Sequence, residues 1–110
     1  MTFNKLSIVI PVYNEGPTIH LILDKIQEVE LPDSIEKELI LVNDCSTDNS
    51  VESIEKYRAD NPLMNIQFYQ HDVNKGKGAA LHTGIQKATG EFLVIQDADL
   101  EYDPQEYHLL

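Results

Sequence analysis

Short apolar segments alternate with segments of helical periodicity along the chain, and this alternation restricts the possible folds more than any other feature. Four segments rich in Val, Ile, Leu or Phe are typical of buried strands: residues 6–12, 38–43, 65–70 and 91–96. Strands that alternate with helices favour a parallel sheet, with right-handed crossovers and helices on both faces. The sequence therefore predicts an α/β fold.

Three helices are expected between these strands. The first begins behind Gly16-Pro17 and buries residues at the i, i+3, i+4 and i+7 positions, which are Ile19, Ile22, Leu23 and Ile26. The second follows the cap-forming residues 46–50 and ends at Asn61-Pro62. The third runs from near Gly78 to Thr89, and its buried face is expected to carry Leu81, Ile85 and Ala88.

Composition places the chain among ordinary globular domains and limits its partners. Its 110 residues are 42% hydrophobic and 25% charged, which suits one domain with a core. The 8 basic and 19 acidic residues give a net charge of -11, which repels nucleic acid and anionic membrane surfaces. A phosphorylated ligand stays compatible if a divalent cation lies between its phosphates and protein carboxylates.

Cysteine use and hydropathy indicate a cytoplasmic location. Cys45 is the single cysteine, so the chain can form no internal disulfide, which fits a reducing compartment. Residues 1–5 lack the features of a signal peptide, and no apolar run is long enough to cross a bilayer. No membrane segment is therefore expected in this chain.

Acidic residues follow the fourth predicted strand in a pattern that suits a divalent cation. Asp97 and Asp99 are separated by one residue, and Glu101 follows them. Mg2+ and Mn2+ prefer oxygen ligands, and Mg2+ is typically held by one or two carboxylates together with substrate phosphates. The alternative is that these acids solvate the loop before a helix that begins at Asp103-Pro104.

Polar residues also follow the other three strands, and the carboxyl ends of parallel strands share one edge of a sheet. Asp44 ends the second strand, where its carboxylate could accept N–H groups from uracil or guanine, although a helix cap is the alternative. For Asp48, which also precedes the second helix, the cap is preferred.

The first strand ends with a kink at Pro11, an aromatic at Tyr13 that could stack on a base, and a carboxylate at Glu15. Lys75 and Lys77 lie in the glycine-containing loop that opens the third helix, a suitable place for phosphates, although a flexible helix start with solvated lysines is the alternative. Four histidines and Cys45 show no metal-ligand or catalytic spacing and are interpreted as incidental: His20, His71, His82 and His108.

Four motifs together resemble the family 2 glycosyltransferases, and most closely the branch of dolichyl- or polyprenyl-phosphate mannosyl and glucosyl synthases. The motifs span nearly the whole chain, in residues 8–15, 42–48, 74–81 and 96–101. The resemblance implies a Rossmann-like GT-A fold and a metal-dependent, inverting transfer of a hexose from a UDP- or GDP-sugar. It also implies polyprenyl phosphate as acceptor, and a full-length protein at the cytoplasmic face of the membrane.

The same resemblance implies roles for individual residues. Mg2+ or Mn2+ would be held by Asp97, Asp99 and Glu101, although many members of the branch have glutamine where Glu101 stands. Lys77 would lie near the donor phosphates. The remaining donor contacts would come from Pro11, Val12, Tyr13, Glu15, Asp44, Asp97 and Ala98.

The expected domain is the nucleotide-sugar-binding, N-terminal part of a glycosyltransferase, because the chain ends about two turns after the helix predicted at Asp103. The acceptor-binding part and the catalytic base would lie beyond Leu110. Two other classes of protein fit the sequence less well. A signalling receiver should carry an acidic pair after its first strand, where this chain has Tyr13-Asn14-Glu15. A sugar nucleotidyltransferase should carry a glycine-rich basic loop at the same place, and this chain has none.

Overall fold

The computed structural model describes residues 4–31 and 35–98. Strands and helices alternate as the sequence predicts, with strand boundaries within two residues of those expected. The elements are β1 (Lys5–Val12), α1 (Ile19–Glu28), β2 (Glu36–Asn43), α2 (Ser50–Asp60), β3 (Ile66–Gln70), α3 (Lys77–Lys87) and β4 (Phe92–Ile95). The helix expected at Asp103 lies outside the described residues.

The four strands form one parallel sheet in the order β3-β2-β1-β4. The chain steps from β1 to β2 and β3 in one direction, and β4 then pairs on the opposite side of β1. The switch in direction therefore lies between β1 and β4. In open α/β sheets, ligands bind outside the carboxyl ends of the strands at such a switch point.

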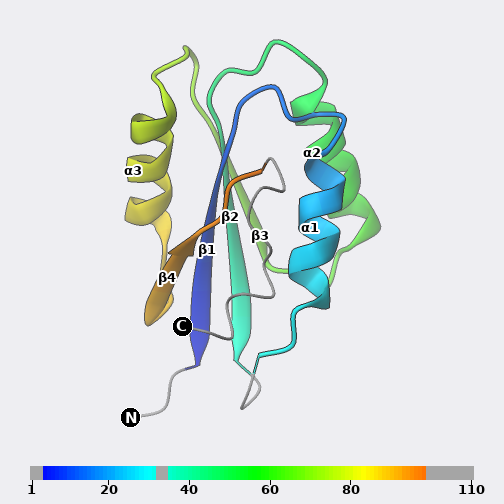
Figure 1. Ribbon diagram of the computed structural model, residues 1–110, viewed down its shortest axis with the longest axis vertical. Coiled ribbons are helices and arrows are strands. Elements are labelled where there is room, and N and C mark those ends of the chain that lie inside the picture. Colours follow the sequence, from blue (N-terminus) through cyan, green and yellow to red (C-terminus); the bar gives the residue numbers. More distant parts are fainter. Residues whose placement is uncertain (1–3, 32–34, 99–110) are drawn as a thin grey trace.

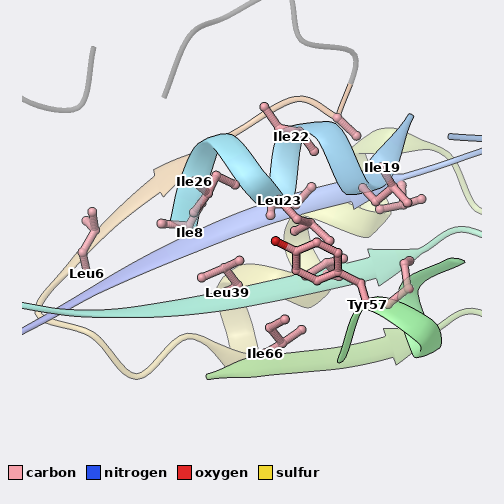
Figure 2. Close-up of a cluster of buried hydrophobic side chains, with 14 residues drawn as sticks. Leu6, Ile8, Ile19, Ile22, Leu23, Ile26, Leu39, Tyr57 and Ile66 are labelled. Atoms are coloured by element: carbon pink, nitrogen blue, oxygen red, sulfur yellow. The ribbon is translucent and has the colours of Figure 1, made fainter. Parts of the chain in front are cut away.

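Helices cover both faces of the sheet, as predicted: α1 and α2 lie on one face and α3 lies on the other (Figure 1). The larger core lies under α1 and α2. The four apolar residues predicted on α1 are fully buried there against side chains of β1 and β2 (Figure 2). Tyr57 of α2 closes this core, and its hydroxyl donates a hydrogen bond of 2.8 Å to Asp24 of α1.

The buried face of α3 differs from the prediction at Leu81 and Ile85, whereas Ala88, which directly follows the helix, is partly buried and packs against the core on this side of the sheet. Leu81 is only partly buried and Ile85 is 47% exposed, whereas Ala80 and Gly84 face the sheet. A Cβ at Gly84 would lie 2.4 Å from Cγ1 of the fully buried Val9, so the helix approaches β1 too closely for a larger side chain. Only small residues fit on the face of α3 that lies against the sheet, because the helix and β1 are so close. Hydrophobic periodicity carries no information about that distance.

Two glycines of α3 give a matched test of this close approach. Gly84→Ala is expected to lower the free energy of unfolding by about 1 kcal/mol, because overpacking outweighs the gain in helix propensity. Gly78→Ala, whose Cβ would have nothing within 4 Å, is expected to raise the free energy of unfolding by about 0.5 to 1 kcal/mol. Urea denaturation measures both, and an equal gain in stability from the two substitutions would contradict the packing described here.

The edge strand β4 is less buried than its apolar sequence predicts. Phe92 is 61% exposed and Ile95 is 49% exposed. Within the described residues, β4 pairs with β1 alone and has no strand on its other side. Also within residues 4–31 and 35–98, no helix has the length and apolar character needed to cross a membrane.

A buried carboxylate at the amino end of the sheet fixes the start of β4. Glu38 of β2 accepts hydrogen bonds from the Ser7 hydroxyl at 2.8 Å, the Thr89 backbone N–H at 2.9 Å and the Thr89 hydroxyl at 2.6 Å. Ser7 in turn accepts the N–H of Gly90 at 2.8 Å. Burial opposes ionisation of Glu38, but the bonds from Thr89 and Ser7 outweigh it and hold the pKa of this carboxyl below its ordinary value. The turn between α3 and β4 is thereby tied to β1 and β2.

Candidate functional site

A cavity of about 250 Å³ lies at the carboxyl ends of the strands, where the chain switches direction between β1 and β4. All eight residues predicted to contact a donor line it: Pro11, Val12, Tyr13, Glu15, Asp44, Lys77, Asp97 and Ala98. The structure adds Asn74, Gly76 and Ala80 to the wall. Residues from four separate motifs are therefore gathered around one space, large enough for part of a nucleotide.

Side-chain and backbone hydrogen bonds join the loop after β1 to the loop after β2. Asn14 has a positive φ of 53° and bonds in both directions, donating its N–H to the Ser46 hydroxyl at 2.9 Å and accepting the Thr47 N–H at 2.8 Å. The Glu15 N–H donates to the Ser50 hydroxyl at 3.0 Å. These bonds hold the backbone beside Tyr13 and Glu15 before any ligand arrives.

The predicted capping role of Asp48 is confirmed, although Asn49 is the N-cap residue by position and makes no side-chain cap bond. One carboxylate oxygen of Asp48 accepts the Ser50 N–H at 2.9 Å and the Ser50 hydroxyl at 2.6 Å. The other accepts the Gly16 N–H at 3.1 Å. Asp48 therefore starts α2 and also ties it to the loop after β1.

Asp44 is buried, and its carboxylate holds the loop between β3 and α3. It accepts the backbone N–H of Lys75 and that of Gly76, each at 2.8 Å, and Nδ1 of His71 at 2.9 Å. Burial opposes ionisation, but the bonds from Lys75, His71 and Gly76 outweigh it, so the pKa of Asp44 lies below its ordinary value. Asp44 therefore enters the cavity as a charged acceptor with a fixed orientation.

His71, interpreted from sequence as incidental, is part of this arrangement. Its ring is largely buried, and its second nitrogen, Nε2, lies 2.9 Å from the Thr83 hydroxyl of α3. Its position directly after β3, at the edge of the sheet that carries the other site residues, could have identified His71 as a site residue from the sequence. Asn74 and Gly76 occupy the same loop, and Gly76 has a φ of 94°, which favours glycine.

The first strand contributes an exposed aromatic and a carboxylate to the cavity. Tyr13 is 46% exposed, which leaves its ring free to stack on a flat ligand. Glu15 is partly buried, and one of its oxygens accepts the Thr18 hydroxyl at 3.2 Å. Val12 is almost fully buried and contributes to the core as well as to the cavity wall.

Lys77 and Asp97 are in direct contact in the lining of the cavity. The Lys77 ammonium lies 2.5 Å from an Asp97 oxygen, and the Lys77 side chain is 61% exposed. The positive charge beside Asp97, after the end of β4, is thus that of the Lys77 ammonium group. The pair places a positive and a negative group at the opening, where a metal-bound phosphate would need both.

The residues present fit a hard divalent cation as far as the structure describes them. Asp97 provides carboxylate oxygens that are partly exposed and line the cavity, which is the donor chemistry that Mg2+ and Mn2+ prefer. The other two predicted ligands, Asp99 and Glu101, lie outside the described residues. Among residues 4–31 and 35–98, no three His, Cys, Asp or Glu side chains form a metal-binding group by themselves.

Comparison with known proteins finds relatives that are named as glycosyltransferases or as sugar transferases. The chain is 39% identical to the uncharacterized glycosyltransferase YibD of Escherichia coli over 97% of its own length and 29% of that protein. It is 36% identical to the undecaprenyl-phosphate 4-deoxy-4-formamido-L-arabinose transferase of Proteus mirabilis, over 94% of the chain and 31% of that enzyme. The chain thus spans about three tenths of the length of these relatives.

Two solved structures share the fold. One is the mannosyltransferase PcManGT of Pyrobaculum calidifontis in complex with GDP-Man and Mn2+. The match covers 96% of this chain and 30% of that protein, with a TM-score of 0.84 and 30% sequence identity. The other is TarS of Staphylococcus aureus in complex with UDP, where the match covers 86% of this chain and 27% of that protein, with a TM-score of 0.75 and 32% sequence identity. These neighbours confirm the Rossmann-like GT-A fold predicted from sequence. The family model for glycosyl transferase family 2 matches residues 7–110, and the chain belongs to that family.

Proposed function

We propose that residues 1–110 form the nucleotide-sugar-binding part of a metal-dependent, inverting glycosyltransferase, and that the acceptor-binding part belongs to the rest of the protein. The observation that carries the proposal is the cavity at the switch point, which gathers residues of all four family motifs around one space. The receiver and nucleotidyltransferase alternatives lose their support, because the chain belongs to glycosyl transferase family 2.

Different residues around the cavity would bind different parts of the donor, according to their chemistry. Tyr13 offers an aromatic face to a base, and Asp44 offers a charged acceptor to its N–H groups. Lys77, at the start of α3, would bind the phosphates, because an ammonium group and a helix N-terminus both attract anions. The exposure of Lys77 and its bond to Asp97 place that charge at the mouth of the cavity.

Mg2+ or Mn2+ is proposed to bind Asp97, Asp99 and Glu101. When bound, the ion would neutralise charge on the leaving nucleoside diphosphate as a Lewis acid. Asp97 would exchange its contact with the Lys77 ammonium for the ion, and Lys77 would then contact the phosphate oxygens. An acceptor oxygen would attack the anomeric carbon from the face opposite the leaving group, which inverts the configuration there.

The acceptor is proposed to be polyprenyl phosphate, on the basis of the motif pattern and of the Proteus mirabilis relative, which is named as an undecaprenyl-phosphate transferase. A lipid acceptor places the full-length protein at the cytoplasmic face of a membrane, where the sugar nucleotide is also available. The donor is a UDP- or GDP-hexose.

The test is turnover by the full-length protein with a panel of UDP- and GDP-hexoses. We expect release of nucleoside diphosphate that requires Mg2+ or Mn2+ together with polyprenyl phosphate, and a glycolipid with inverted anomeric configuration. Full turnover in the presence of a chelator would contradict the metal site. Formation of pyrophosphate from a nucleoside triphosphate and a sugar phosphate would instead indicate a nucleotidyltransferase.

A further inference from the structure

The hydrogen bonds around Asp44 limit how many more it can accept. Oδ1 accepts two, from the Lys75 N–H at 2.8 Å and from Nδ1 of His71 at 2.9 Å. Oδ2 accepts one, from the Gly76 N–H at 2.8 Å. A carboxylate offers about four acceptor positions, two on each oxygen. Within the part of the chain that the structure describes, three are used, so the position that is left for a ligand lies on Oδ2.

The bond from His71 to Asp44 is well fixed. Because the Asp44 carboxylate is charged, Nδ1 of His71 carries the proton and donates it, while Nε2 lies 2.9 Å from the Thr83 hydroxyl. The ring is therefore held by Asp44, directly after β2, on one side and by Thr83 of α3 on the other. The His71 and Asp44 side chains are 8% and 5% exposed, so water offers little competition for either group. His71 thus keeps Oδ1 saturated.

The two candidate bases place different demands on a carboxylate. Uracil presents one ring N–H, which needs one acceptor position. Guanine presents a ring N–H beside an amino group, and a carboxylate satisfies the two together only when both of its oxygens are open. At Asp44 a guanine would leave one donor without a partner, and an unpaired polar group in a closed site reduces affinity.

We propose that His71 is a specificity-determining residue, which occupies Oδ1 of Asp44 and thereby selects a uracil base over guanine. This inference rests on the proposed nucleotide-sugar site and narrows its donor to a UDP-sugar. His71 does not line the cavity, so it acts through Asp44 and is a positioning residue.

The test is the ratio of the dissociation constants of UDP and GDP for the full-length protein with Mn2+, measured by calorimetry. UDP is expected to bind at least about tenfold more tightly than GDP, which is the effect of one hydrogen bond to a charged group. His71→Leu opens one acceptor position on Oδ1, which still accepts the Lys75 N–H, and is expected to bring the ratio toward one. His71→Asn, which retains a donor near the Nδ1 position, is expected to keep most of the discrimination.

Two controls separate base selection from a general loss of structure. His82→Leu makes the same substitution on the exposed surface of α3 and is expected to change neither dissociation constant. Binding of Mn2+ and pyrophosphate, which have no base, is expected to be the same in His71→Leu as in the wild type.

Three results would overturn the inference alone. The first is equal or tighter binding of GDP by the wild type, and the second is a UDP to GDP ratio that His71→Leu leaves unchanged. The third is an equal weakening of UDP, GDP and pyrophosphate in His71→Leu, which would show a merely structural role. Binding of neither nucleotide by the wild type would overturn the proposed function together with this inference, whereas equal binding of both would overturn the inference alone.

Discussion

Asp44→Ala is expected to weaken the binding of a nucleoside diphosphate about 100-fold. The substitution removes a charged acceptor for the base, and a hydrogen bond to a charged group contributes about 1.5 to 3 kcal/mol. It also releases the N–H groups of Lys75 and Gly76, so the loop that carries Lys77 loses its fixed position. A total of about 3 kcal/mol corresponds to roughly two orders of magnitude in the dissociation constant.

Calorimetric titration with nucleotide and Mn2+ measures this effect. Asp60→Ala is the matched control, because Asp60 is an exposed acid near the end of α2 whose partner is Lys56 in the same helix. It is expected to leave the affinity unchanged. The affinity of Asp44→Asn is expected to lie between those of Asp44→Ala and Asp60→Ala. The asparagine amide has only one oxygen to accept the three hydrogen bonds that the Asp44 carboxylate accepts. An affinity for Asp44→Ala within about twofold of the wild type would show that Asp44 has no part in donor binding.

Glu38→Ala is expected to lower the free energy of unfolding by about 3 kcal/mol, the largest stability effect among the single substitutions considered. Glu38 is 4% exposed and accepts three hydrogen bonds from Ser7 and Thr89, with the Lys5 ammonium 3.9 Å away. Removing one member of a buried charged network leaves its partners without acceptors, which costs about 3 to 5 kcal/mol in other proteins. The expected loss lies at the lower end of this range because Lys5, the charged partner of Glu38, is partly exposed.

Urea denaturation at neutral pH gives the comparison, with Glu36→Ala as the control. Glu36 lies two residues earlier in the same strand and is exposed, and its carboxylate accepts a hydrogen bond from Asn65 at the surface. Its substitution is expected to change the free energy of unfolding by less than about 0.5 kcal/mol. A loss below about 1 kcal/mol for Glu38→Ala would mean that the network at the amino end does not fix β4.

The order of elements and the location of the site were predictable from the sequence for one physical reason. Apolar runs identify the strands, and parallel strands place all their carboxyl ends at one edge, so the polar residues that follow each strand must converge. Glu15, Asp44, Lys77 and Asp97 do converge on one cavity. Their contacts with a donor stay predictions, as do the metal-binding roles of Asp99 and Glu101.

Two features could not be read from periodicity. The small residues Ala80 and Gly84 face the sheet because α3 approaches β1 closely, and that distance is a property of the assembled layers. His71 and Asp44 are 27 residues apart, and their contact follows from the pairing of β2 with β3, which no local pattern reports. The strand order β3-β2-β1-β4 is likewise set by which side of β1 receives β4.

The proposed function requires that the cavity at the switch point bind a nucleoside diphosphate together with a divalent cation. A thermal-shift titration measures this binding, with UDP, GDP and their hexose conjugates, each in Mn2+ and in a chelator. A ligand at a hundredfold its dissociation constant should stabilise the folded protein by about 2.7 kcal/mol, and we expect such a shift only when nucleotide and metal are both present. A cooperative melting transition that no nucleotide shifts in the presence of Mn2+ would contradict the proposed function.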